Sequence, residues 1–236
     1  HKAIRRQRQM CIRDRVYTEN AEESDSYWYY LVSFKDKNGT VRNLPFNSQT
    51  GDSYMRAKVI KGKTYIFNAD GTMEDGRVIL TNKNNNGVSD YKGGAVSKAM
   101  TNGTYYFNEN SGSVNDQMVT GKTTVTKDGE DYYYYFDKTT GRAVTDIVKD
   151  GVVYGHDGER IDAEDGNTNA IVTLDHDTYY NKKVNGTTCE YIKAGSRVIV
   201  SSTGKLRTSG TVKVDGVKCQ VNASADGNWN VAEDVE

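Results

Sequence analysis

Histidines, carboxylates and cysteines are the residues of this sequence that could carry catalytic or metal chemistry. His156 lies in YGHDGE next to the Asp-Gly pair at 157–158, which indicates an exposed turn residue. His176 lies between Asp175 and Asp177, and successive side chains of a strand point to opposite faces. Both carboxylates would then lie opposite the imidazole, so a metal site at His176 would need ligands from elsewhere in the chain. We therefore predict no metal site.

The carboxylates and asparagines do not form a catalytic or calcium pattern either. The segment NKNNNG at 82–87 is similar to the first half of an EF-hand loop, but its twelfth position is Gly93, where a bidentate glutamate is needed. Paired acidic residues at 22–23 and 130–131 are typical of surface turns, and without a pocket they do not indicate a glycosidase. We expect a chain that is not an enzyme and that uses no cofactor.

Cys189 and Cys219 each lie three residues after a turn glycine and are 30 residues apart. If these are equivalent repeat positions, the two side chains could stack closely enough for a disulfide. Two buried thiols are the alternative, and two cysteines alone do not decide between them.

Aromatic residues offer a different chemistry, which is binding rather than catalysis. Residues 129–141 read GEDYYYYFDKTTG, with five consecutive rings between two glycines. In a strand these rings divide between two faces. One face carries Tyr132, Tyr134 and Phe136, and the other carries Tyr133 and Tyr135. We expect one set to pack against neighbouring segments and the other to lie near the surface beside Lys138 and Arg142.

The elements that position these rings are predicted to be short strands joined by tight turns. Twelve Asn-Gly and Asp-Gly dipeptides use about half of the 23 glycines, and both dipeptides tolerate the positive φ angles of type I′ hairpin turns. The sequence has no sustained helical periodicity and no apolar run near the length of a membrane span. The sequence therefore predicts an all-β chain without membrane insertion.

The aromatic segments repeat. The segments GKTYIFNADGTM (62–73), GTYYFNENSGSV (103–114), GEDYYYYFDKTTGRAV (129–144) and GVVYGHDGERI (151–161) share a turn glycine, an aromatic strand and a second glycine. Phe67 and Phe107 are 40 residues apart and Tyr134 and Tyr154 are 20 apart, whereas Phe107 and Phe136 are 29 apart, which indicates an insertion. A period of about 20 residues favours a β-solenoid, in which stacked hairpins bury rings that one hairpin could not bury alone.

Residues 60–79, IKGKTYIFNADGTMEDGRVI, resemble the cell-wall-binding repeat family, which includes choline-binding, glucan-binding and clostridial-toxin repeats. Residues 99–161 resemble it less closely and residues 26–55 faintly. The resemblance implies a β-hairpin solenoid with ligand pockets between repeats, on secreted or surface proteins of Gram-positive bacteria. The choline-binding version carries recurring tryptophans, whereas Trp28 and Trp229 do not recur at the repeat period. Tyrosine and phenylalanine suit a saccharide, because a ring face covers C–H groups while the hydroxyl forms hydrogen bonds.

The resemblance implies non-catalytic binding to a cell-wall polysaccharide, teichoic acid or glucan, through aromatic rings between repeats. The candidate ligand-binding residues are Tyr65, Phe67, Tyr105, Tyr106, Tyr133, Tyr135 and Tyr154. The alternative is a structural β-solenoid stalk that binds nothing. Near-complete burial of the rings would favour the stalk, and shallow ring-lined grooves would favour the binding module.

The first fifteen residues differ from the rest. Residues 5–15, RRQRQMCIRDR, resemble the translation of a transposon-end sequencing adaptor, and we exclude 1–15 as non-native. This segment holds six of the 31 basic residues and one of the 32 acidic residues, which leaves 25 and 31 and a formal charge of −6. We therefore expect no nucleic-acid partner, and we expect the native N-terminus to lie outside the sequence.

The predicted organisation is an elongated β-hairpin solenoid of degenerate repeats of about 20 residues over 16–165. A C-terminal β region follows over 166–236, made of diverged repeats or a small β domain. We expect a secreted or cell-surface location. The sequence does not define an oligomeric state.

Overall fold

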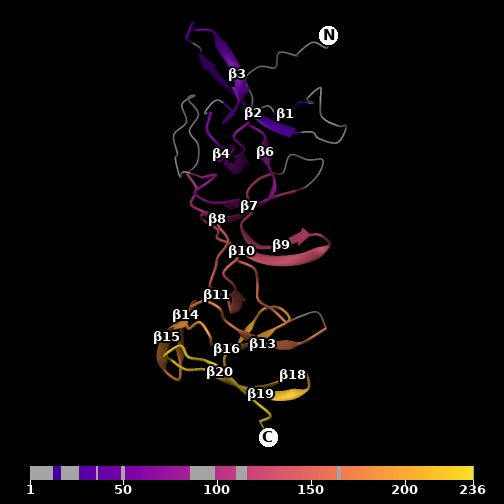
Figure 1. Ribbon diagram of the computed structural model, residues 1–236, viewed down its shortest axis with the longest axis vertical. Helices are drawn as coiled ribbons and strands as arrows, with labels where there is room; N and C mark the ends of the chain where they lie inside the picture. Colours follow the sequence, from indigo (N-terminus) through magenta and orange to yellow (C-terminus); the bar gives the residue numbers. More distant parts are fainter. Residues whose placement is uncertain are drawn as a thin grey trace. The chain divides into compact units, whose positions relative to one another are not determined.

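The computed structural model describes residues 13–16, 27–35, 37–48, 51–85, 99–109, 116–163 and 166–235. These residues form twenty short strands, most of them paired as antiparallel hairpins, and they contain no helix (Figure 1). The predicted all-β class of short hairpins is confirmed. Within this part of the chain, no helix could cross a lipid bilayer.

Contacts within the chain group the residues into two units. Unit 1 comprises residues 1–119 with 140–142, and unit 2 comprises residues 120–139 with 143–236. The predicted regions 16–165 and 166–236 were defined by repeat pattern rather than by contacts, and they remain a prediction.

The described residues of unit 1 form three small sheets, with strand orders β1-β2-β3, β4-β5-β6 and β7-β8. The strands are β1 (Arg13–Val16), β2 (Tyr27–Lys35), β3 (Val41–Pro45), β4 (Arg56–Ile60), β5 (Lys63–Phe67), β6 (Met73–Glu74), β7 (Gly76–Leu80) and β8 (Gly103–Phe107). Strand β1 overlaps the segment that resembles an adaptor. Its pairing with β2 uses backbone groups, which any non-proline sequence offers, so it does not bear on the origin of that segment.

Unit 2 contains four sheets, with strand orders β10-β9, β12-β11-β14-β15, β13-β16-β17 and β18-β19-β20. The first six strands are β9 (Gly121–Lys127), β10 (Glu130–Phe136), β11 (Ile147–Lys149), β12 (Val152–Tyr154), β13 (Asn169–Thr173) and β14 (Thr178–Val184). The other six are β15 (Thr187–Ile192), β16 (Arg197–Ser201), β17 (Leu206–Arg207), β18 (Thr211–Val214), β19 (Val217–Asn222) and β20 (Asn230–Glu233). The pairing of β11 with β14 is parallel.

Four of the twelve Asn-Gly and Asp-Gly dipeptides form the predicted two-residue hairpin turns. In these four dipeptides both residues have positive φ, as a type I′ turn requires. They are Asp128-Gly129, Asp150-Gly151, Asn185-Gly186 and Asp215-Gly216. Lys61-Gly62 forms an equivalent turn between β4 and β5, although lysine does not favour positive φ. The glycine is therefore the better predictor of the turn than the residue before it.

Rings from successive aromatic segments meet within each unit. In unit 1 the rings of Phe46 and Phe67 lie edge to face, with centroids 5.2 Å apart. In unit 2 Tyr135 and Tyr154 lie edge to face at 6.3 Å. Both spacings fall in the favourable range for aromatic pairs. Stacking of neighbouring hairpins thus buries rings that each hairpin alone would expose.

The aromatic run of β10 alternates as predicted. Tyr134 and Phe136 stack on one face, with centroids 5.5 Å apart and planes 20° from parallel. Tyr135 on the other face is also buried, because the β11–β12 hairpin packs against it in one cluster with Val152 and Tyr154. Alternation therefore predicted which rings share a face but not how far each face is covered.

The C-terminal part of unit 2 has an aliphatic core. Val198, Ile199 and Val200 of β16 are fully buried in it, and Trp229 packs edge to face against Tyr180. The two cysteine thiols of this core are free and buried, and burial raises the pKa of each. Of the two alternatives for the cysteines, the structure therefore shows buried thiols.

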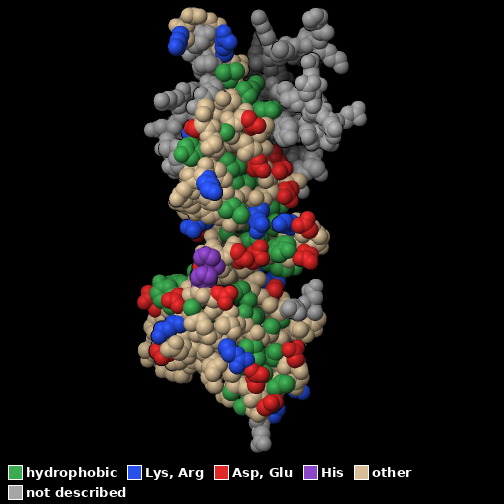
Figure 2. Space-filling model, viewed as in Figure 1, with side chains coloured by type: hydrophobic (Ala, Val, Ile, Leu, Met, Phe, Trp, Pro, Cys, Tyr) green, Lys and Arg blue, Asp and Glu red, His purple; other side chains and the backbone are tan. Residues whose placement is uncertain are grey.

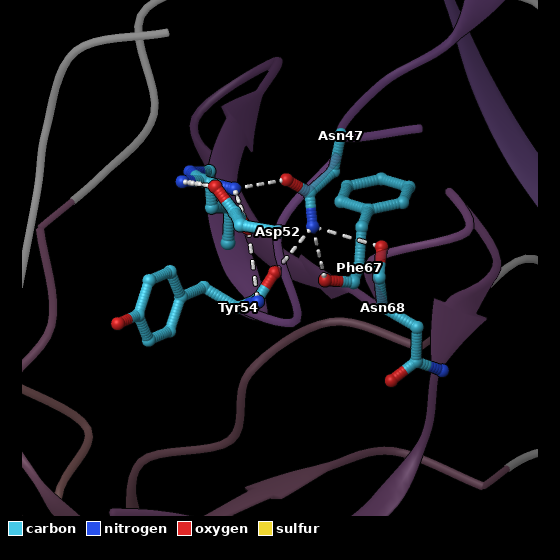
Figure 3. Close-up of polar contacts among 6 residues, drawn as sticks. Asn47, Asp52, Tyr54, Phe67 and Asn68 are labelled. Atoms are coloured by element: carbon cyan, nitrogen blue, oxygen red, sulfur yellow. Dashed lines mark hydrogen bonds and ion pairs between the residues drawn. The ribbon is translucent and has the colours of Figure 1, made fainter. Parts of the chain in front are cut away.

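A buried asparagine connects three segments of unit 1 (Figure 3). The Asn47 side-chain amide donates hydrogen bonds to the carbonyl oxygens of Tyr54, Phe67 and Asn68, at 2.7, 3.3 and 2.8 Å. Its Oδ1 accepts a hydrogen bond of 2.6 Å from Arg56, which also pairs with Asp52. Asn47 is fully buried, with φ of 74°, a conformation that asparagine tolerates better than most residues. The segment after β3 is thereby joined to the end of β5.

Buried tyrosines make the stability of the fold depend on pH in the alkaline range. Burial and the carboxylate of Glu109, which accepts a hydrogen bond from the ring hydroxyl, raise the pKa of Tyr106 to about 12. Burial also raises the pKa of Tyr154 and Tyr180. Tyrosinate then forms more readily in the unfolded chain, so these groups contribute stability below their unfolded pKa of 10.0 that is lost as pH rises through the folded values.

We expect the free energy of unfolding to be insensitive to tyrosine ionisation below pH 10.0 and to fall between that pH and about 12. Urea denaturation at several pH values, followed together with tyrosinate absorbance, measures this. The variant Tyr106→Phe should show a shallower fall. An equally steep fall in that variant would contradict the assignment to Tyr106.

Candidate functional site

Most of the predicted ligand-binding rings are in the interior. Tyr133 is 36% exposed, whereas each of the other six rings is at most 8% exposed. Those six are Tyr65, Phe67, Tyr105, Tyr106, Tyr135 and Tyr154. The structure therefore gives these six a packing role and leaves Tyr133 as the ring that a ligand could contact over a substantial area.

Tyr133 lies in a pocket of about 260 Å³ in unit 2. We name this the Tyr133 pocket. Its lining comes from the β9–β10 hairpin, from the β11–β12 hairpin with the segment after it, and from the turn between β16 and β17. The lining residues are Lys122, Thr123, Thr124, Tyr133, Tyr134, Val152, Tyr154, Arg160, Thr203 and Lys205. Tyr133 and Tyr154 are thus brought together, while the predicted candidates of unit 1 and Tyr135 do not line it.

Backbone hydrogen bonds fix the walls of the Tyr133 pocket. The amide of Arg160 donates to the carbonyl oxygen of Tyr133 at 2.7 Å, which holds the segment after β12 against β10. The amide of Val153 donates to the carbonyl oxygen of Gly204 at 3.0 Å, which holds the β16–β17 turn against β12. Gly204 has φ of 70°, and a Cβ there would lie 2.5 Å from Cγ of Arg160. Any other residue at position 204 would therefore collide with the Arg160 side chain.

Arg160 covers one face of the exposed ring. Its guanidinium carbon lies 3.7 Å from the centroid of the Tyr133 ring, within the range of a cation–π contact. Nε of Arg160 donates to Oδ2 of Asp162 at 2.7 Å, and Nη2 of Arg160 also donates to this oxygen. The contact that a quaternary ammonium would make with this face of Tyr133 is already made by the protein.

The charge of the lining is positive. Lys122, Arg160 and Lys205 contribute cationic groups, and the lining contains no carboxylate. Lys122 and Lys205 are exposed, while Asp162 balances part of the charge of Arg160. Three threonine hydroxyls of the lining can each donate and accept a hydrogen bond. The arrangement can therefore hold a polar ligand with an anionic group next to an aromatic ring.

Sequence reasoning missed a second group of exposed rings in unit 2. Tyr179 and Tyr191, on β14 and β15, are 37% and 45% exposed and lie edge to face at 5.4 Å. Tyr179 also borders an open pocket of about 620 Å³ beside β11 and β14. Tyr179 in TYYNKKV and Tyr191 in TTCEYI each stand next to a residue that is buried on the opposite face of the strand. Neither segment matches the aromatic repeat, so the repeat pattern did not identify these two rings.

The asparagine-rich segment 82–87, of which residues 82–85 are described, bonds to the protein itself. The side-chain amide of Asn85 donates to the carbonyl oxygen of Met100 and to Oδ1 of Asn102, both at 2.9 Å. Asn84 receives a hydrogen bond from the amide of Thr81 at 2.8 Å. These contacts are those of a structural turn. Gly93, at the position where an EF-hand loop needs a glutamate, lies outside the described residues.

Comparison with solved structures finds similar chains of low identity. Choline-binding protein F from Streptococcus pneumoniae is 14% identical, over 86% of this chain and 83% of that chain, with a TM-score of 0.25. The same protein in the presence of a peptidoglycan analogue is 15% identical, over 88% of each chain, with a TM-score of 0.24. CbpJ from the same organism is 15% identical, over 84% of this chain and 87% of that chain, with a TM-score of 0.17.

At these TM-scores the likeness carries no conclusion about this chain. No known protein family matches the sequence, and no curated protein matches it. The fold class and the site therefore rest on the strands, contacts and pockets described above.

Proposed function

We propose that the chain is a non-catalytic module that binds a cell-wall polysaccharide, and that the Tyr133 pocket is its ligand site. The observation that supports this most is an exposed tyrosine ring in a pocket between successive hairpins. Ring faces pack on the C–H groups of sugars, and neighbouring hydroxyl and cationic groups supply the polar contacts that fix orientation. The resemblance of residues 60–79 and 99–161 to cell-wall-binding repeats agrees with this function.

The charge of the pocket favours an anionic polymer, such as teichoic acid, over a neutral glucan. Three cationic side chains line it without a carboxylate. A phosphate or carboxylate on the polymer could bind Lys122 and Lys205 at the rim while a sugar contacts the exposed part of Tyr133. A choline group would meet like charge in this pocket, and the guanidinium of Arg160 already lies over the ring.

A calorimetric titration with soluble polyglycerol phosphate teichoic acid tests the proposal. We expect saturable binding that weakens at high salt, because exposed charges are screened. Tyr133→Ala should weaken it about tenfold, which corresponds to ~1.4 kcal/mol. Tyr132→Ala is the matched control, since Tyr132 is the adjacent ring of β10 but does not line the pocket. Added choline should not compete. Equal affinity of the two variants, or displacement by choline, would contradict the proposal.

A structural stalk is the second candidate function, and the burial of six of the seven predicted rings favours it. A stalk needs rings only as packing between hairpins, which is the role these six have. The two functions differ in what Tyr133 does. If no wall polymer binds and Tyr133→Ala changes only stability, the stalk is the better account.

A further inference from the structure

Three potential metal ligands from separate segments meet on the surface of unit 2. Asp146 directly precedes β11, His156 follows β12, and His176 lies before β14. The sequence argument required ligands from elsewhere for a metal site at His176, and the fold supplies them. The two histidine side chains form one patch on the surface (Figure 2).

Backbone pairing holds the three segments together. The amide of Asp146 donates to the carbonyl oxygen of Gly155 at 3.0 Å, which places it beside His156. The amide of Tyr179 donates to the carbonyl oxygen of Asp146 at 2.8 Å, as part of the parallel pairing of β11 with β14. The proximity of the three side chains thus follows from the strand register.

The ligand atoms are already close to the spacing that a metal needs. Nδ1 of His156 lies 2.8 Å from Oδ2 of Asp146. One ligand atom from each of the three residues lies within 4.8 Å of the others. Two ligands of a tetrahedral zinc ion lie about 3.3 Å apart, given metal–ligand distances of about 2.0–2.1 Å. Both imidazoles are exposed, so their side chains have room to rotate toward a shared ion.

The two histidine rings lie next to each other at the surface. The two rings lie 4.1 Å apart and nearly parallel, with planes at 10°. The His156 side chain stacks on His176 and forms a hydrogen bond with Asp146, and it is 69% exposed, so the ring is accessible from solvent. Two neutral imidazoles and one carboxylate form a borderline donor set that suits zinc, copper or nickel, whereas magnesium and calcium prefer oxygen ligands alone.

We propose that Asp146, His156 and His176 bind one divalent transition-metal ion, with Zn²⁺ as the ion that fits three ligands and an open fourth position. The ion would join the β11–β12 hairpin to the loop before β14. Because only the folded chain presents the three ligands together, binding would also stabilise unit 2. This site is separate from the Tyr133 pocket, and none of its ligands lines that pocket.

Calorimetric titration of the full chain with ZnCl₂, after removal of metal with a chelator, tests the proposal. We expect one ion per chain, no binding of Mg²⁺ or Ca²⁺, and a rise in the thermal midpoint with Zn²⁺. His156→Ala and His176→Ala should each weaken binding at least about tenfold. Asp175→Asn is the matched control, since it removes a neighbouring carboxylate outside the proposed ligand set. His1→Ala and Cys11→Ser test the N-terminal segment, and they should leave the affinity unchanged.

Mapping on the unaltered chain provides a second test that does not depend on the folding of any variant. Substoichiometric Cu²⁺ should broaden the amide NMR signals of residues 146–147, 155–156 and 176 before any others. Lack of stoichiometric Zn²⁺ binding, binding that survives loss of both histidines, or broadening confined to the N-terminal segment would each overturn the proposal.

Discussion

Replacing Phe67 with alanine is expected to lower the free energy of unfolding of unit 1 by about 3–5 kcal/mol. The ring is fully buried and lies edge to face against Phe46. It belongs to a cluster with Val32 and Tyr65, so one substitution removes contacts between the segment after β3 and the β4–β5 hairpin. The loss combines the transfer free energy of the ring with the cost of the cavity left behind.

Urea denaturation of the full chain, followed by tyrosine fluorescence and circular dichroism, measures this loss. Ile79→Ala is the control in the same unit, because Ile79 is 49% exposed on β7. That variant should change the unfolding free energy by less than about 1 kcal/mol. If Phe67→Ala cost no more than Ile79→Ala, the rings would not bind successive hairpins together.

Asn47→Ala is expected to lower the free energy of unfolding by about 3 kcal/mol, because it removes four hydrogen bonds of the network in Figure 3, two of them buried. The carbonyl oxygens of Tyr54, Phe67 and Asn68 lose an amide donor, and Arg56 loses an acceptor. Alanine also adopts the positive φ of this position less readily than asparagine does.

Asn47→Gly separates the two causes, since glycine accepts φ of 74° without strain but makes no side-chain hydrogen bond. We expect Asn47→Gly to lower the free energy of unfolding by most of the amount that Asn47→Ala does. Asn43→Ala is the matched control, because Asn43 is exposed and its side-chain oxygen accepts a hydrogen bond from the Ser33 hydroxyl at the surface. Recovery of stability in Asn47→Gly would show that backbone strain, rather than hydrogen bonding, explains the loss.

The sequence predicted the local features of this fold because turns and alternation are local properties. Asp128-Gly129 predicted the β9–β10 turn, and the period of two predicted that Tyr134 and Phe136 share a face. Alternation does not say what covers a face. Tyr135 is buried because the β11–β12 hairpin packs on it, and that depends on contacts between hairpins rather than on the residues of β10.

The candidate sites were less predictable for the same reason. Arg160 lies over Tyr133 because the segment after β12 returns to β10. His156 and His176 meet through a single parallel pairing, of β11 with β14, which no turn dipeptide signals. In the sequence LPFNSQTG, Asn47 is typical of an exposed turn residue, but its side chain is fully buried.

Co-sedimentation with purified Gram-positive cell walls tests the central proposal most directly, if it is carried out before and after extraction of the anionic wall polymers. We expect the chain to be retained on intact walls, to be released by extraction, and not to be retained on neutral glucan. Tyr133→Ala should reduce retention, and Tyr132→Ala should not. Retention that is equal on intact and extracted walls, or that is unchanged in Tyr133→Ala, would contradict binding through the Tyr133 pocket.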